Sequence, residues 1–160
     1  MGLTENSTTM AYPKRSLRLL FVIFSGALFV HAAVQPLHQD ALREYCTKGT
    51  PFDFYLVDLR GKGEIIEMIG NKNCRPYNLE WPDEFKREII RVPRDAAVIV
   101  YCASGGRATG AANWLTENGY TKVFNAGGMS TWQGPIIPLS AARSPEALPE
   151  FSMKASPNIR

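Results

Sequence analysis

Histidine and cysteine, the side chains that most often hold transition metals, are scarce in this sequence. The 160 residues include two histidines and three cysteines. One of the histidines, His31, lies in an N-terminal segment that does not resemble the rest of the chain. A histidine-based metal site is therefore not expected.

The sequence also lacks long acidic, basic or repetitive blocks, and no recurring period is found. These absences argue against a low-complexity chain and against a repeat architecture. Apolar residues make up 45% of the chain and charged residues 21%, which is the range of ordinary globular domains. A chain of this length fits one domain better than two, so we expect one site.

No apolar run is long enough to span a bilayer comfortably. The N-terminal run covers residues 19–30, which as a helix reaches about 18 Å, against roughly 30 Å for the hydrocarbon core. Basic residues precede the run and small residues follow it, the order typical of a secretory signal peptide. These are Lys14, Arg15 and Arg18 before it, and Ala32 and Ala33 after it.

Residues 1–32 are accordingly predicted to be a signal peptide that is cleaved before Ala33, with Val30 and Ala32 at the cleavage site. The protein is then expected to be exported, to the periplasm. The main alternative is an N-terminal membrane anchor formed by residues 19–34. A buried core helix fits less well, because the charged residues cluster at one end only.

Most of the positive charge belongs to this N-terminal segment. The whole chain has a formal net charge of +3. Residues 1–32 hold three basic residues and Glu5, a net +2, which leaves +1 for residues 33–160. A nucleic-acid partner would require a basic face of clustered lysine and arginine, so none is expected.

The three cysteines are Cys46, Cys74 and Cys102. An odd number in an exported protein leaves at least one thiol free or paired elsewhere. In an oxidising compartment Cys46 and Cys74 could form a disulfide and leave Cys102 as the free thiol. The alternative is that Cys46 and Cys74 are two small buried side chains.

Short apolar, β-prone runs alternate with amphipathic stretches along the rest of the chain. Strands are predicted at residues 54–59, 77–79, 96–101 and 122–125. Helices are predicted at 39–48, 64–69, 82–90 and 107–118, with a helical turn at 129–133. This alternation predicts an α/β fold with a central, mostly parallel sheet flanked by helices on both faces.

The folded domain is predicted to cover residues 33–138. Prolines are frequent beyond it and periodic apolar residues are few. Residues 139–160 are therefore predicted to form an irregular C-terminal tail, mobile past about Ala142.

The strand at 96–101 runs directly into the loop Cys102-Ala103-Ser104-Gly105-Gly106-Arg107. In α/β sheets, ligands bind outside the carboxyl ends of the strands, where this cysteine is expected to lie. The two glycines permit unusual backbone angles, so that the loop amides can point inward. Such a ring of donors beside a helix N-terminus suits a thiolate, a persulfide or an oxyanion.

Cys102 is therefore the candidate nucleophile, and Ala103, Ser104, Gly105, Gly106 and Arg107 are the candidate substrate-binding residues. The loop has two other interpretations. A buried cysteine before an ordinary tight turn would need no function. A dinucleotide-binding turn needs a three-glycine spacing that Gly105, Gly106 and Gly110 do not match.

The loop, followed by Ala108, resembles the active-site loop of rhodanese-domain sulfurtransferases, whose common form is Cys-x-x-Gly-x-Arg and then a small residue. Two further segments are similar to that family in the same order. They are Leu56-Val57-Asp58-Leu59-Arg60 with Glu64, and the stretch from Gly119-Tyr120 through Val123 to Gly127-Gly128-Met129 and Trp132. The chain departs from the family at 70–76, where Asn71-Lys72-Asn73-Cys74-Arg75 replaces a His-Ile-Pro-Gly-like turn.

The resemblance, which covers residues 39–132, implies a rhodanese-like fold and a sulfurtransferase. Such an enzyme moves a sulfane sulfur from a donor to a thiophilic acceptor through a persulfide on Cys102. The implied partners are a small sulfur-containing anion, either thiosulfate or a persulfide, and a thiol or cyanide as acceptor. Because an exported protein must keep Cys102 reduced where most cysteines oxidise, we expect either a recessed loop that protects the sulfur or a thiol reductant protein as a further partner. Neither a metal nor an organic cofactor is needed.

Three charged residues receive expected roles from the same resemblance. Asp58 and Arg60 are expected to be structural and to tie the strand end to its loop. Arg107 either steers an anionic donor, which is the favoured interpretation, or forms a salt bridge at the start of its helix.

Three rival functions stay open at this point. One is a non-catalytic binding module that senses sulfide or redox state. Another is a phosphatase or arsenate reductase, although related domains of that kind tend to have a loop one residue longer between Cys and Arg. The third is a thiol oxidoreductase in which Cys74 resolves an oxidised Cys102.

Overall fold

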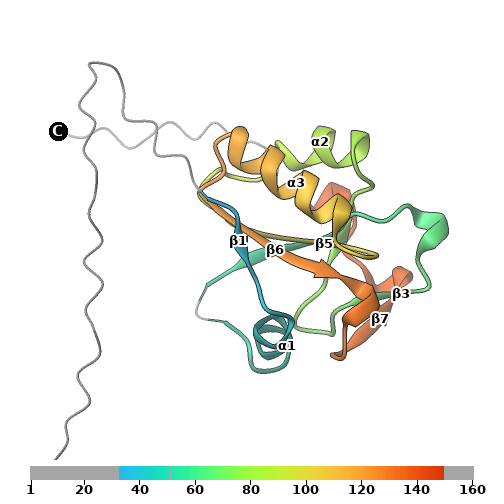
Figure 1. Ribbon diagram of the computed structural model, residues 1–160. Coiled ribbons are helices and arrows are strands. Elements are labelled where there is room, and N and C mark those ends of the chain that lie inside the picture. The colour runs from blue at the N-terminus through green and yellow to red at the C-terminus, as the bar shows by residue number, and fades with distance from the viewer. Residues whose placement is uncertain (1–32, 51, 150–160) are drawn as a thin grey trace, which may run out of the picture.

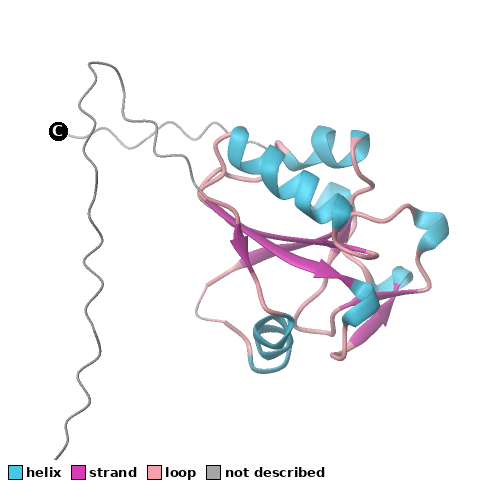
Figure 2. Cartoon of the chain, viewed as in Figure 1, coloured by secondary structure: helices cyan, strands magenta, loops and turns pink. Residues whose placement is uncertain are grey.

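The computed structural model describes residues 33–50 and 52–149, so the predicted signal peptide at 1–32 lies outside the described residues. Five parallel strands form the central sheet in the order β1-β6-β5-β2-β4 (Figures 1 and 2). Their bounds are β1 Gln35–Pro36, β2 Phe54–Asp58, β4 Tyr77–Asn78, β5 Ala97–Cys102 and β6 Lys122–Gly128. A second, antiparallel sheet joins β3 (Glu67–Ile69) to β7 (Ile136–Pro138).

Helices cover both faces of the central sheet (Figure 1). They are α1 (Gln39–Lys48) on one face, and α2 (Asp83–Ile89) and α3 (Gly106–Glu117) on the other. None of the helices in the described part of the chain is long and apolar enough to cross a membrane. The predicted α/β fold, with a mostly parallel sheet between helices, is confirmed.

The side chains of the central strand β5 alternate between two apolar cores. Val98, Val100 and Cys102 pack in the core that α2 and α3 cover. Ile99 and Tyr101 pack in the core that α1 covers. Because successive residues of a strand point to opposite faces, the register of β5 assigns Cys102 to the face of α2 and α3.

The helix predicted at residues 64–69 is wrong. A 3-10 turn, η1 (Lys62–Glu64), ends there and β3 begins at Glu67. The apolar spacing that indicated a helix includes Ile66, whose exposed fraction is 87%, whereas Met68 and Ile69 are fully buried. Pairing of Met68 with Ile137 on β7, a distant segment, overrides the local pattern.

The folded unit continues past residue 138, where the sequence analysis placed its end. Residues 139–149 contain two more 3-10 turns, η3 (Leu139–Ala141) and η4 (Pro145–Ala147). The Arg91 guanidinium donates hydrogen bonds to the carbonyls of Pro145 at 3.0 Å and Leu148 at 2.8 Å. Leu148 is 2% exposed and belongs to the core beneath α2 and α3. Residues 139–149, which we call the strap, therefore cover this core.

Replacing Leu148 with alanine should lower the free energy of unfolding by about 2–4 kcal/mol, because it leaves a cavity in a packed core. Ile66→Ala is the matched control, since the Ile66 side chain is largely in solvent, and we expect it to change stability by less than about 0.5 kcal/mol. Urea unfolding followed by tryptophan fluorescence measures both. Equal effects of the two substitutions would show that the strap is not part of the core.

Candidate active site

Cys102 ends β5 at the carboxyl edge of the sheet, and α3 begins at Gly106. The loop between them turns at Gly105, whose φ of 105° lies in the left-handed region that side chains disfavour. This turn brings the backbone N–H of Gly105 to the Cys102 Sγ, to which it donates a hydrogen bond at 3.1 Å. The sulfur thus lies at the N-terminus of α3, where backbone N–H groups have no helical partners.

Opposing influences set the pKa of the Cys102 thiol. Burial is the largest single influence and raises the pKa, because it disfavours the thiolate. Hydrogen bonds from the backbone N–H groups of four loop and helix residues lower it, and together they prevail. These residues are Ala108, Gly105, Ser104 and Arg107. The pKa of Cys102 therefore lies below its usual value, which favours a reactive thiolate.

The rate at which iodoacetamide alkylates Cys102 should rise with pH to a plateau, with a midpoint below that of the unfolded chain, because the pKa of the thiol is lowered. A lowered pKa shifts the thiolate to lower pH, so the sign of the displacement is toward acid. The measurement is simple because Cys102 is the free cysteine of the three. Urea-unfolded protein provides the reference. A midpoint at or above that of the unfolded protein would contradict the stabilisation of the thiolate by the loop amides.

The loop rests on the end of β6, which contains an irregularity. Val100 pairs with Asn125, whereas Cys102 pairs with Gly128, so β6 has one residue more than β5 over this stretch. The Ser130 N–H donates to the Ala103 carbonyl at 3.0 Å. A Cβ added to Gly128 would lie 2.5 Å from the Ala103 oxygen and 2.7 Å from the Ser104 Cα. Gly128 therefore permits the close approach that supports the loop.

Gly128→Ala should reduce kcat/KM for any reaction of Cys102 by roughly tenfold to a hundredfold, because displacing a reacting group by about 1 Å has that effect. Gly63→Ala is the matched control, because a Cβ there meets nothing within 4 Å. The alkylation rate of Cys102 gives a second measurement that does not depend on the substrate. Unchanged kinetics in Gly128→Ala would mean that the loop does not depend on β6.

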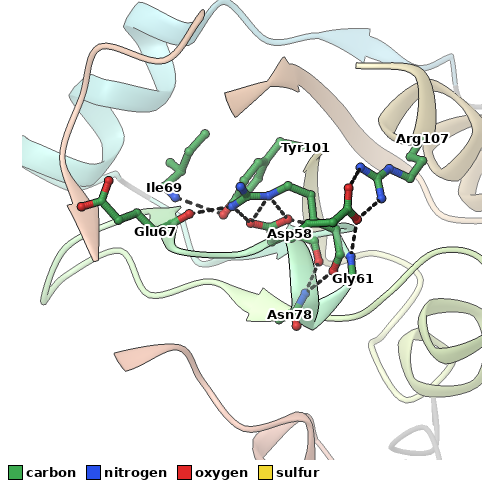
Figure 3. Close-up of polar contacts among 9 residues, drawn as sticks. Asp58, Gly61, Glu67, Ile69, Asn78, Tyr101 and Arg107 are labelled. Atoms are coloured by element: carbon green, nitrogen blue, oxygen red, sulfur yellow. Dashed lines mark hydrogen bonds and ion pairs between the residues drawn. The ribbon is translucent and has the colours of Figure 1, made fainter. Parts of the chain in front are cut away.

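Arg107 forms a two-pronged ion pair with Glu64 (Figure 3). Its Nη1 lies 2.6 Å from Glu64 Oε2, and its Nη2 lies 3.0 Å from Oε1. The Gly61 N–H donates to the same carboxylate at 2.8 Å. The Arg107 and Gly61 hydrogen bonds lower the pKa of Glu64 to about 2. The salt bridge, one of the two interpretations of Arg107, is present in the structure, and donor steering stays a prediction.

Arg107 is also electrically coupled to the nucleophile. Glu64 is the main cause of the raised pKa of the Arg107 guanidinium, and the Cys102 sulfur contributes in the same direction. The hydrogen bonds of the Arg107 side chain go to Glu64. Glu64 accompanies the signature at residues 56–60, and its pairing with Arg107 was not predicted because the two residues are far apart in the chain.

Asp58 and Arg60 form a buried ion pair beside the site (Figure 3). The Arg60 Nη2 lies 2.6 Å from Asp58 Oδ2, and the two residues are 7% and 0% exposed. The same Nη2 donates to the Glu67 carbonyl at 2.7 Å. The Asn78 side-chain amide donates to the Arg60 carbonyl at 2.8 Å. These contacts hold the end of β2 against β3 and β4.

Cys46 and Cys74 form a disulfide, which realises one of the two alternatives left open by the sequence. It links α1 to the turn before β4 and is buried in the core that α1 covers. Cys102 packs in the other core, so the sheet separates the thiol from the disulfide. Cys74 is therefore not placed to resolve an oxidised Cys102, and the arrangement does not support the oxidoreductase alternative.

An open groove of about 750 Å³ adjoins the loop at Ser104. The N-terminal end of α1 forms one wall through His38 and Gln39, and the end of β6 forms another. The Gln39 side-chain amide donates to the Gly128 carbonyl at 2.8 Å, which joins the two walls. Within residues 33–50 and 52–149 there is no group of three or more His, Cys, Asp or Glu side chains that could hold a metal ion.

Comparison with known proteins places this geometry in a family. Residues 39–135 match the model of the rhodanese-like domain. A sulfurtransferase of Allochromatium vinosum is 33% identical over 91 residues, which are 56% of this chain and 80% of the relative.

Solved structures give the same result for the fold. A rhodanese-related protein from Thermoplasma volcanium aligns with a TM-score of 0.52 and 23% identity, over 64% of this chain and 97% of that one. A thiosulfate sulfurtransferase from Pseudomonas aeruginosa aligns with a TM-score of 0.52 and 24% identity, over 66% of this chain and 20% of that one. At these identities the two structures show a shared fold alone. The family model spans more than half of the chain, and the protein therefore belongs to the rhodanese-like domain family.

Proposed function

We propose that this protein is a sulfurtransferase that carries a sulfane sulfur on Cys102 as a persulfide. The observation that carries the proposal is the hydrogen bond from the Gly105 N–H to the Cys102 Sγ, within a ring of further loop amides. These donors stabilise negative charge on sulfur, whether the thiolate or the terminal sulfur of a persulfide. The sulfurtransferase of Allochromatium vinosum among the relatives agrees with this chemistry.

The reaction has two steps, each a displacement at sulfur. The Cys102 thiolate attacks the outer sulfur of a donor such as thiosulfate, the sulfur–sulfur bond of the donor breaks, and sulfite leaves with the bonding electron pair. A thiol or cyanide then attacks the outer sulfur of the persulfide, and the Cys102 thiolate leaves. The full cycle returns Cys102 to its thiolate without an oxidant or a reductant. A thiol reductant protein is therefore needed only after an external oxidant has reacted with Cys102.

Mass spectrometry of the intact protein tests the first step. After incubation with a sulfur donor we expect an increase of about 32 Da, the mass of one sulfur atom, located on the peptide that contains Cys102. Addition of cyanide should remove the increment and release thiocyanate. No increment with any sulfane-sulfur donor would favour a binding module, and phosphatase turnover without sulfur uptake would favour the phosphate-directed alternative.

We also propose that the protein is exported after removal of residues 1–32. The buried Cys46–Cys74 disulfide supports this proposal, because such bonds persist in oxidising compartments. N-terminal sequencing of the protein recovered from producing cells should give a chain that begins at Ala33. An intact N-terminus in the membrane fraction would favour the anchor instead.

A further inference from the structure

The charged side chains around Gly61 and the Glu64–Arg107 pair are mostly acidic. They are Lys62, Glu64, Glu80, Glu84 and Arg107. Arg107 is paired with Glu64, and Lys62 lies 3.9 Å from Glu84. The Glu80 carboxylate lies against Gly61, where an added Cβ would stand 2.9 Å from Glu80 Oε1. Three carboxylates thus face two cations, a formal net charge of −1.

The buried side chains of the described residues add no free positive charge to offset this net negative charge. Arg60 is the buried cation of the described residues, and its guanidinium donates three hydrogen bonds of 2.6–3.1 Å to the Asp58 carboxylate. Within the loop itself, Arg107 is the one charged side chain. Its guanidinium is occupied by both oxygens of Glu64, a geometry that binds a carboxylate strongly.

An anionic donor therefore meets a site whose positive charge is already compensated. To bind Arg107 it must enter next to Glu64 or displace a carboxylate that the Gly61 N–H also holds. Either event costs more for an ion of two negative charges than for an ion of one, because the repulsion scales with the charge. The attacking thiolate adds a further negative charge at the same place.

We infer that Glu64 selects the donor by its charge, so that the site takes sulfur from donors with one negative charge or none in preference to the thiosulfate dianion. Organic thiosulfonates and organic persulfides are the corresponding chemical classes. The inference rests on the proposed sulfur transfer at Cys102. Glu64 acts through Arg107 and the local potential and does not touch the reacting sulfur.

Methanethiosulfonate and thiosulfate make a matched pair of probes, because both present an outer sulfur bonded to a sulfonyl sulfur. In each case the Cys102 thiolate forms a bond to the outer sulfur and the bond to the sulfonyl sulfur breaks. The leaving group takes the electron pair and departs as methanesulfinate or as sulfite. The probes carry one and two negative charges, so their comparison isolates the effect of charge.

In Glu64→Gln at low salt, the ratio of kcat/KM for thiosulfate to kcat/KM for methanethiosulfonate should rise by roughly threefold to tenfold. This is the expected effect of removing the repulsion between Glu64 and the second negative charge of thiosulfate at close range. Glutamine retains an acceptor for the Gly61 N–H and for Arg107. Glu44→Gln is the matched control, because Glu44 pairs with Lys48 on α1 and its removal changes the net charge of the chain equally. The control should leave the ratio unchanged.

The salt dependence gives a readout that a purely structural role would not move. In Glu64→Gln, kcat/KM for thiosulfate should fall as ionic strength rises from about 20 mM to about 200 mM, because salt screens the attraction of an Arg107 charge that Glu64 no longer neutralises. In the native protein it should stay level or rise. A ratio that is unchanged or lowered in Glu64→Gln, or equal salt profiles in the two proteins, overturns the inference.

The same assays separate this inference from the proposed function. If the native protein takes sulfur from both probes and the ratio does not respond to Glu64, only the charge selection fails. If neither probe places sulfur on Cys102, the proposed sulfur transfer fails and the inference fails with it. Loss of both reactions in Glu64→Gln with intact unfolding behaviour would assign Glu64 to holding Arg107 in place, which also overturns charge selection.

Discussion

Cys102→Ser should take up no sulfur from any donor and should lose sulfur-transfer turnover by at least about a thousandfold, as expected when the nucleophile of a covalent mechanism is removed. A serine hydroxyl stays protonated near neutral pH and forms no persulfide. The loop amides that lower the pKa of the Cys102 thiol cannot overcome that difference. Thiocyanate formation and the mass of the intact protein measure the loss.

The substitution is small enough to test chemistry rather than folding. Cys102 is 1% exposed, so unfolding in urea must be measured beside activity to show that the fold is retained. Cys102→Ala provides a second variant without a hydroxyl. Substantial turnover in either variant would contradict the persulfide mechanism and would direct attention to a role for the loop in binding alone.

Asp58→Ala should lower the free energy of unfolding by about 3–5 kcal/mol, the largest loss of stability expected from a single substitution here. The change leaves the Arg60 guanidinium charged and buried with its carboxylate removed. It also releases the end of β2, from which the chain continues to Gly61 and Glu64. We therefore expect a weaker Glu64–Arg107 pair in addition to the loss of stability.

The matched control for Asp58→Ala is Asp40→Ala. Asp40 lies 2.6 Å from Arg43, the same distance as in the Asp58–Arg60 pair, but the Asp40 and Arg43 side chains are 65% and 44% exposed. An exposed pair contributes less than about 1 kcal/mol. Urea unfolding at neutral pH compares the two variants. Similar losses in both would show that burial does not determine the effect.

Much of the central sheet could be predicted because its strands are locally distinct. The runs that become β2 and β5 are apolar and β-prone, and the loop after β5 carries its own glycines. The strand β3 and the strap could not be predicted in this way. β3 exists because it pairs with β7, about 70 residues later, and the strap is held by side-chain hydrogen bonds from Arg91. Neither interaction leaves a periodic pattern in the sequence.

The candidate site also has features that could be predicted from the sequence and features that could not. Cys102 and its loop are contiguous, so sequence reasoning could identify them together. The role of Gly128 depends on the irregular pairing of β6 with β5, and the pairing of Glu64 with Arg107 depends on the packing of two distant segments. The spacing of residues within a motif contains no information about such contacts. For this reason the compensation of the Arg107 charge by Glu64 could not be predicted from the loop.

The placement of the three cysteines on two sides of one sheet has a practical consequence for preparing the protein. Three cysteines can pair in three ways, and only the Cys46–Cys74 pairing leaves the chain with a free thiol at Cys102. In the other two pairings Cys102 is consumed and the sheet cannot form as described. A count of thiols gives one equivalent for each of the three pairings, so the labelled cysteine must be identified by alkylation and peptide mapping. A label on the Cys102 peptide alone reports correct oxidative folding and the fraction of molecules able to react.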